Sequence, residues 1–178
     1  MTEIAMEKIE AAEQSIAYND YETVYCFDKF GEEIFKQIGT NSVEFTEEQR
    51  ESLFNTILSH NHPYKAYKNV KECDTVVSYN DVSLAYKYKL LELRLVHGSK
   101  IHLFVWSDTA TDDNLRHLCI NIKNIVDNTK IKMDNIKTKG KEAMLRVHQD
   151  GIWNIIDFLK KNENKCNYVY IMRRRRYV

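Results

Sequence analysis

The chain has 178 residues, of which 43% are hydrophobic and 29% charged, with 26 basic and 26 acidic side chains. One proline and five glycines exclude a collagen-like chain and a disordered chain rich in proline, serine and glycine. No run approaches the ~18 apolar residues of a transmembrane helix, and the acidic first residues do not resemble a secretory signal. Four widely spaced cysteines without a Cys-x-x-Cys pair favour a reduced, cytoplasmic chain.

The zero net charge hides an uneven distribution along the chain. Residues 1–60 carry 13 acidic and 4 basic side chains, whereas residues 137–178 carry 4 acidic and 11 basic ones. The basic end contains the run Arg173–Arg176, which could contact nucleic acid or another anionic partner. A solvated terminus is the preferred interpretation, because the sequence has no zinc-finger spacing and no RRM-like aromatic motif.

The first part of the chain predicts a helix and a β-hairpin. A loose apolar stripe with helical spacing gives way to β-branched and aromatic residues, which favour strands. The predicted elements are a helix over 3–17 with Ile4, Ile9, Ala12 and Ile16 on one stripe, a strand over 22–27, a turn over 28–31 and a strand over 33–38.

A capping box then predicts a second helix, because Thr46 can cap it and Gln49 stands at N3. We expect this helix to reach about Asn55 and to bury Leu53 and Phe54. The later elements are a short strand over 56–59, a polar loop over 64–77, a helix from Ser78 to about Leu91, a hairpin of strands 92–96 and 101–106, helices over about 111–128 and 139–162, and a last strand over 168–172. This order predicts a single α/β (α+β) domain with a mixed central β-sheet flanked by helices.

The most informative motif is His60-Asn61-His62-Pro63. Residues two apart on a strand point to the same face, so His60 and His62 project together with Cα atoms ~6.6 Å apart. Two imidazoles at this separation can converge on one metal ion at Zn–N distances of ~2.0–2.1 Å. Pro63 has no N–H and a fixed φ, so it ends the pairing of the strand. The motif is therefore compatible with a zinc site at an open strand end, although His-x-His-Pro by itself more often has no metal.

A catalytic zinc also needs a third protein ligand and an open position. Asp81 is the candidate, because it would stand at N3 of the helix that Ser78 caps, where the helix N-terminus favours an ionised carboxylate. Cys73 is the alternative ligand, since a thiolate binds zinc well. Glu22 opens a strand flanked by apolar residues and is the candidate general base.

Taken alone, each feature has a simpler structural explanation. Ser78-x-x-Asp81 is more often a helix cap than a ligand site, and Glu22 can be a charge at a strand edge. The remaining histidines have no paired ligand spacing and are expected in surface or structural roles: His97, His102, His117 and His148. The order of the pieces is more specific than any piece by itself.

That order, a glutamate on a strand, then His-x-His-Pro, then Ser-x-x-Asp before a further strand, resembles the motif of the JAMM (JAB1/MPN/Mov34) metalloproteases. The resemblance is to RadC-like proteins and to JAB-like domains of phage structural proteins, and the asparagine between the histidines matches as well. It covers about residues 20–106 and continues more weakly through 152–170. It implies one JAB/MPN-like domain over 1–178, with a core over 20–106 and a helical, basic extension over 107–178.

By this resemblance His60, His62 and Asp81 would be zinc ligands, Glu22 the general base, and Ser78 the residue that stabilises the oxyanion. Catalytic members of the family cleave amide and isopeptide bonds, often after the C-terminal glycine of ubiquitin-like proteins. The resemblance thus implies a zinc-dependent peptidase or isopeptidase with a protein or peptide substrate.

The chain departs from the family pattern in the long stretch between the second histidine and the aspartate. Asp81 lies 19 positions after His62. This insert is compatible with a substrate-gripping segment or with an inactive site. The alternative function is therefore a catalytically inactive JAB-like binding module of a phage or mobile element that engages a host protein. A RadC-like association with DNA is a third, weaker hypothesis.

Overall fold

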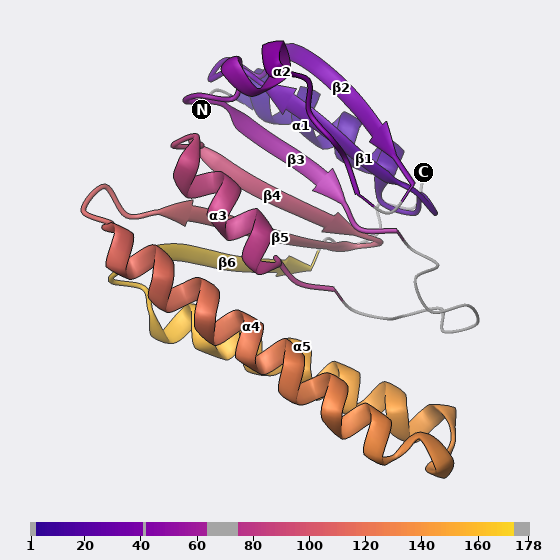
Figure 1. The fold of residues 1–178 in the computed structure, drawn as a ribbon. Coiled ribbons are helices and arrows are strands. Elements are labelled where there is room, and N and C mark those ends of the chain that lie inside the picture. Colours follow the sequence, from indigo (N-terminus) through magenta and orange to yellow (C-terminus); the bar gives the residue numbers. More distant parts are fainter. Residues whose placement is uncertain (1–2, 41, 64–74, 173–178) are drawn as a thin grey trace.

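Six strands form one sheet in the order β2-β1-β3-β4-β5-β6 (Figure 1). Only β3 and β4 pair in parallel, and every other neighbouring pair is antiparallel, so the sheet is mixed as predicted. The computed structural model describes residues 3–40, 42–63 and 75–172. Its strands are β1 (Glu22–Phe27), β2 (Glu33–Gly39), β3 (Ile57–Asn61), β4 (Glu92–His97), β5 (Lys100–Trp106) and β6 (Cys166–Met172). The predicted α+β fold class is confirmed.

The helices cover the two faces of the sheet unequally. One helix, α1, packs on β1 and β3 from one side, while α3 packs on β4 and β5 from the other. There α4 packs on α3 and α5, and α5 packs on β6 (Figure 1). The helices are α1 (Glu3–Ile16), α2 (Glu47–Glu51), α3 (Tyr79–Lys87), α4 (Asp112–Asn135) and α5 (Lys141–Lys161), with a 3₁₀ turn η1 (Lys137–Lys139).

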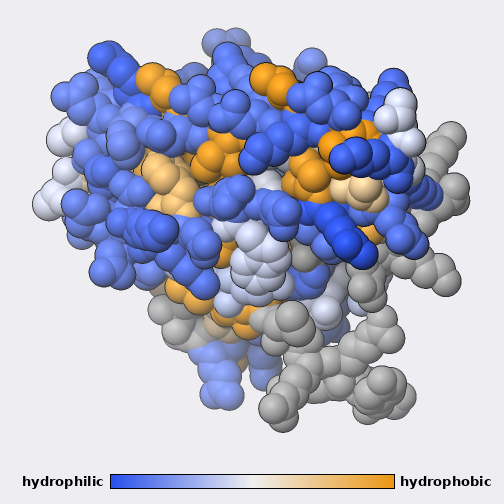
Figure 2. Space-filling model, turned by 90° about the horizontal axis from the view of Figure 1, so that it is seen from below, coloured by the Kyte–Doolittle hydropathy of each residue, from blue (hydrophilic) through white to orange (hydrophobic). Residues whose placement is uncertain are grey.

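The hydrophobic core follows this division into two layers. A large cluster lies between the sheet and α3, α4 and α5, and it includes Leu93, Phe104 and Ile156. A small cluster lies between the sheet and α1. Figure 2, seen from the side of α4 and α5, shows a mostly hydrophilic surface broken by separate apolar spots. The two long helices thus have the amphipathic pattern expected of helices that cover one face of a sheet.

The β3–α3–β4 unit determines where the predicted site lies. Parallel neighbours need a crossover connection, and α3 supplies it here. The N-terminus of such a helix lies near the carboxyl end of the strand that precedes it, where ligands of open α/β sheets commonly bind. Because β1 runs antiparallel to β3, the first residue of β1 lies at the same end. Glu22, His60 and His62 are therefore brought to the same end of the neighbouring strands β1 and β3.

Some predicted element boundaries and burials are wrong. The second helix, α2, ends at Glu51, and a turn follows in which Asn55 has a φ of 57°, so Leu53 is buried but Phe54 is 52% exposed and lies edge-on against Tyr88. Ile4 is 68% exposed, because the buried stripe of α1 runs through Ala5, Ile9, Glu13 and Ile16. The predicted helix over 111–128 continues to Asn135.

Parts of the sequence-based account lie outside the described residues. These are most of the predicted loop over 64–77, which includes Cys73, and the run Arg173–Arg176. Of that loop, Thr75 to Val77 are described, and Val77 is fully buried in the large core cluster. Within the described ranges, none of the helices combines the length and apolar character that crossing a membrane requires.

Candidate metal centre

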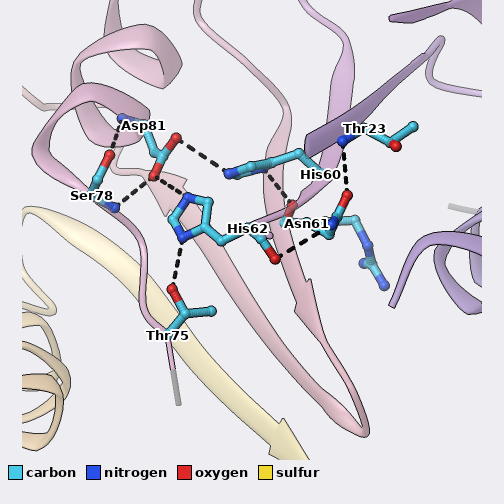
Figure 3. Close-up of polar contacts among 8 residues, drawn as sticks. Thr23, His60, Asn61, His62, Thr75, Ser78 and Asp81 are labelled. Atoms are coloured by element: carbon cyan, nitrogen blue, oxygen red, sulfur yellow. Dashed lines mark hydrogen bonds and ion pairs between the residues drawn. The ribbon is translucent and has the colours of Figure 1, made fainter. Parts of the chain in front are cut away.

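The structure brings His60, His62 and Asp81 together (Figure 3). One ligand atom from each residue lies within 4.8 Å of the other two. Nε2 of His60 is 3.3 Å from Oδ1 of Asp81, and Nε2 of His62 is 3.6 Å from Oδ2 of the same carboxylate. Two imidazole nitrogens and a carboxylate oxygen that converge in this way could hold a metal ion.

The strand geometry explains why the two histidines face the same side. His60 pairs with Val24 on β1 and with Leu95 on β4, so its side chain lies on the face that α3 covers. His62 follows two positions later and has the same orientation, with its ring centroid 5.2 Å from that of His60. The alternation of side chains predicted from the sequence is therefore confirmed for this pair.

A hydrogen bond orients each imidazole through its other nitrogen. Nδ1 of His60 lies 3.1 Å from the backbone oxygen of Arg94. Since a carbonyl only accepts, Nδ1 donates, and in the neutral ring Nε2 carries the lone pair that a metal needs. Nδ1 of His62 lies 2.7 Å from Oγ1 of Thr75, which can accept in the same way. Both Nε2 atoms are thereby directed toward Asp81.

The first turn of α3 holds the third group. Ser78 and Asp81 form a reciprocal capping box: Oγ of Ser78 accepts from the backbone N–H of Asp81 at 3.2 Å, and Oδ2 of Asp81 accepts from the backbone N–H of Ser78 at 2.6 Å. The simpler interpretation of this pair as a helix cap is correct. The Asp81 carboxylate also faces the histidines, so it takes part both in the helix cap and in the candidate metal cluster.

The electrostatics of the cluster favour an ionised carboxylate. Burial opposes ionisation of Asp81, but the attraction of the nearby His60 and His62 outweighs it, so the pKa of this carboxyl lies well below its usual value. Burial also disfavours the charged form of His60, yet the negative charge of Asp81 raises the pKa of the imidazole above its usual value. Asp81 is therefore held in the ionised form, which is the form of a carboxylate that binds a metal.

Nε2 of His60 is a buried nitrogen that faces the carboxylate of Asp81. It is buried and makes no hydrogen bond within the described part of the chain, although the carboxylate lies nearby. A buried polar atom without a partner is costly and calls for an explanation such as an ion. A metal at this position would supply the missing partner.

A cavity of about 770 Å³ opens beside the cluster and contains the other predicted site residues. Glu22 and Ser78 line it together with His60, His62 and Asp81. Burial raises the pKa of Glu22, while the positive charges of His60 and His62 act in the opposite direction. All five residues predicted from the sequence thus share one cavity.

Several contributors to this site have no recognisable pattern in the sequence. Thr75 lies in a stretch that has no periodicity, and its contact with His62 is visible only in three dimensions. His97 and His148 also line the cavity, from β4 and α5. His102 has a structural role, because its Nδ1 lies 2.6 Å from the hydroxyl of Tyr168 and burial lowers its pKa to about 3.

Comparisons with known proteins identify no relative. No family model matches the chain, and neither the curated proteins nor the solved structures contain a match. The geometry of the cluster and its cavity is therefore the basis for a proposed function.

Proposed function

We propose that the chain binds one zinc ion through His60, His62 and Asp81 and hydrolyses an amide bond, as a JAMM-type peptidase or isopeptidase. The observation that supports this most is the convergence of the three ligand groups within 4.8 Å of one another in a cavity that Glu22 also lines. Two histidines and a carboxylate are a donor set that zinc favours in hydrolases, with one position left for water or substrate.

The residues of the chain have separate tasks in this proposal. When bound, zinc would polarise the scissile carbonyl and acidify a water molecule. Glu22 would take the proton of that water and return it to the leaving amine, and its raised pKa suits a group that must do both. The hydroxyl of Ser78 accepts from the backbone of Asp81 and has its own proton to donate to a developing oxyanion.

The cavity is compatible with a protein or peptide substrate. Its volume of about 770 Å³ lies in the range of ligand sites, which span about 300–1,000 Å³. Its walls come from β1, β3, α3 and the segment before α2, where Val43 and Phe45 offer apolar surface. A C-terminal tail of a ubiquitin-like protein is the substrate class that the sequence motif suggests.

Hydrolysis should depend on Glu22. We expect wild-type protein loaded with zinc to cleave a peptide or ubiquitin-like fusion from a substrate panel, and E22Q to lose the cleavage while it still binds the metal. The matched control is E44Q, because Glu44 lines the same cavity but is exposed and is not among the charged groups that act on Glu22.

Two other outcomes would contradict this proposal. Metal binding without any cleavage that depends on Glu22 would favour the inactive binding module that engages a host protein. Absence of metal binding would remove the proposed chemistry altogether.

A further inference from the structure

Asn61 stands between the two candidate metal ligands, but its side chain points to the other face of the sheet. Successive residues of a strand alternate, so His60 and His62 face the cavity while Asn61 faces the layer of α1. The residue is 0% exposed. A fully buried amide needs partners for its acceptor and its two donor hydrogens.

The partners of Asn61 lie on both sides of Glu22. Its Oδ1 accepts from the backbone N–H of Thr23 at 2.8 Å, and its Nδ2 donates to the backbone oxygen of Tyr21 at 3.0 Å (Figure 3 shows the first contact). Longer contacts of Nδ2 reach the backbone oxygens of Asn19 and His62, both at 3.4 Å. The side chain therefore holds the residue before Glu22 and the residue after it.

We call the contacts of Asn61 with Thr23 and Tyr21 the clamp. The pairing between β1 and β3 explains why it is needed. The register between β1 and β3 begins at Phe27 with Ile57 and extends to Val24 with His60. Glu22 lies beyond that last pair and is paired only with Gly39 on the edge strand β2. At this point the amide of Asn61 connects β1 to β3 in place of further backbone pairing.

We propose that Asn61 is a positioning residue that sets the place of the Glu22 carboxylate relative to the ligands His60 and His62. The inference rests on the proposed function, since it assumes that Glu22 acts beside a bound metal. One residue of β3 thus links the ligand pair to the general base: its neighbours supply the imidazoles on one face, and its own side chain fixes the backbone of Glu22 from the other. Substitution of Asn61 would displace Glu22 and leave the ligands in place.

The clamp can be tested first without any metal. The Thr23 amide should be protected from hydrogen exchange in the wild-type protein, and N61A should lower this protection about tenfold or more, as expected for loss of a buried hydrogen bond. The matched control is S59A, because Ser59 lies on the same strand and face and donates to Oε1 of Glu13 at 3.1 Å without contacting the residues beside Glu22. S59A should leave Thr23 protected. If the Thr23 amide exchanges freely in the wild-type protein, the clamp does not exist.

The second readout is the visible spectrum of the cobalt(II)-loaded protein, which depends on the surroundings of the metal. N61A should change this spectrum in the wild-type background and leave it unchanged in the E22Q background, because the effect passes through Glu22. S59A should leave the spectrum as it is. Should N61A fold poorly, N61D keeps the shape and the acceptor for Thr23 but loses the donor to Tyr21, and it should show the same dependence on Glu22.

The outcomes separate this inference from the proposed function. Equal spectral changes in both backgrounds, or none in either, would overturn the positioning role of Asn61 while the metal site stands. A wild-type protein that binds no cobalt would overturn the proposed function and with it the purpose of the clamp, whereas the Thr23 exchange would still show whether the clamp exists.

Discussion

The two faces of strands β3 and β4 each carry a buried cluster of polar side chains, and the clusters differ in how well they are satisfied. On the side of α1, Glu13 is 0% exposed and pairs with Arg94, which is 2% exposed. Arg94 contacts both oxygens of Glu13 and also Glu92, and Ser59 donates to Glu13. On the side of the cavity, His60 keeps a buried nitrogen without a hydrogen bond among the described residues.

This difference separates a structural cluster from a candidate binding site. Glu13 and Arg94 neutralise each other's charge and satisfy each other's hydrogen-bonding groups, so no ligand is needed. His60, His62 and Asp81 converge beside a cavity and leave donor atoms available to an ion. Buried polarity alone does not indicate function; His60 differs because its nitrogen converges with two other ligand groups beside a cavity.

Substitutions in the buried pair Glu13 and Arg94 should have the largest effect on stability. R94M removes the partner of a buried carboxylate, and loss of one partner of a buried ion pair typically costs about 3–5 kcal/mol of unfolding free energy. Urea denaturation followed by circular dichroism measures it. The double variant E13M/R94M removes both charges and should recover much of the loss. A small loss in R94M would show that Glu13 finds water or another partner.

Substitutions in the cluster of His60, His62 and Asp81 should have their largest effect on metal affinity. H60A removes a proposed ligand, so the loss should exceed the ~10–100-fold that follows removal of a residue that only orients a ligand. Competition with a chromophoric chelator measures the affinity. H117A is the matched control, because His117 lies on α4 against Phe158 and not in the cavity. Equal affinities of H60A and H117A would contradict the assignment of the ligands.

The metal affinity should fall as the pH is lowered. A metal binds the neutral imidazole, and the pKa of His60 is raised by Asp81, so protons compete with the metal already above the usual pKa of histidine. Below that pKa we expect about a tenfold loss of affinity per pH unit for each proton displaced. Asp81 stays ionised over this range, because its pKa is low.

The metal-free protein should respond to pH in the opposite direction. The raised pKa of His60 means that its pairing with Asp81 stabilises the fold fully below the unfolded-state pKa and is lost as the pH rises through the folded-state value. Thermal unfolding with and without zinc between pH 5 and pH 8 measures both trends. A metal affinity that does not change with pH would show that the metal does not displace a proton from His60.

We expect the smallest effect on stability at an exposed ion pair. Nζ of Lys8 lies 2.5 Å from Oε1 of Glu32, and both side chains are about half exposed or more. Exposed pairs contribute about 0–1 kcal/mol, so K8A should shift the urea midpoint only slightly. This variant provides the scale against which R94M is compared. A loss as large as that of R94M would remove the distinction between buried and exposed charges.

The sequence predicted the parts of the fold that depend on local patterns. The order of helices and strands follows from periodicity, the caps at Thr46 and Ser78 from side chains three residues apart, and the common face of His60 and His62 from strand alternation. Asp81 was predicted as well, because its helix position and its motif agree.

What the sequence could not show depends on contacts between distant residues. Glu13 interrupts the apolar stripe of α1, and its partner Arg94 is 81 positions away, so neither could be assigned to the interior. Thr75 reaches His62 from a stretch without a pattern. The clamp from Asn61 to Thr23 spans 38 positions and depends on the register of two antiparallel strands. Such pairs are determined by the tertiary fold.

The metal content of the purified protein tests the central claim most directly. Protein prepared without chelator should contain about one zinc ion per chain by elemental analysis, because three protein ligands with an open position make a single site. H60A prepared in parallel should contain none, and H117A should match the wild type. Wild-type protein without metal after incubation with zinc, or H60A with the same metal content as the wild type, would contradict the account.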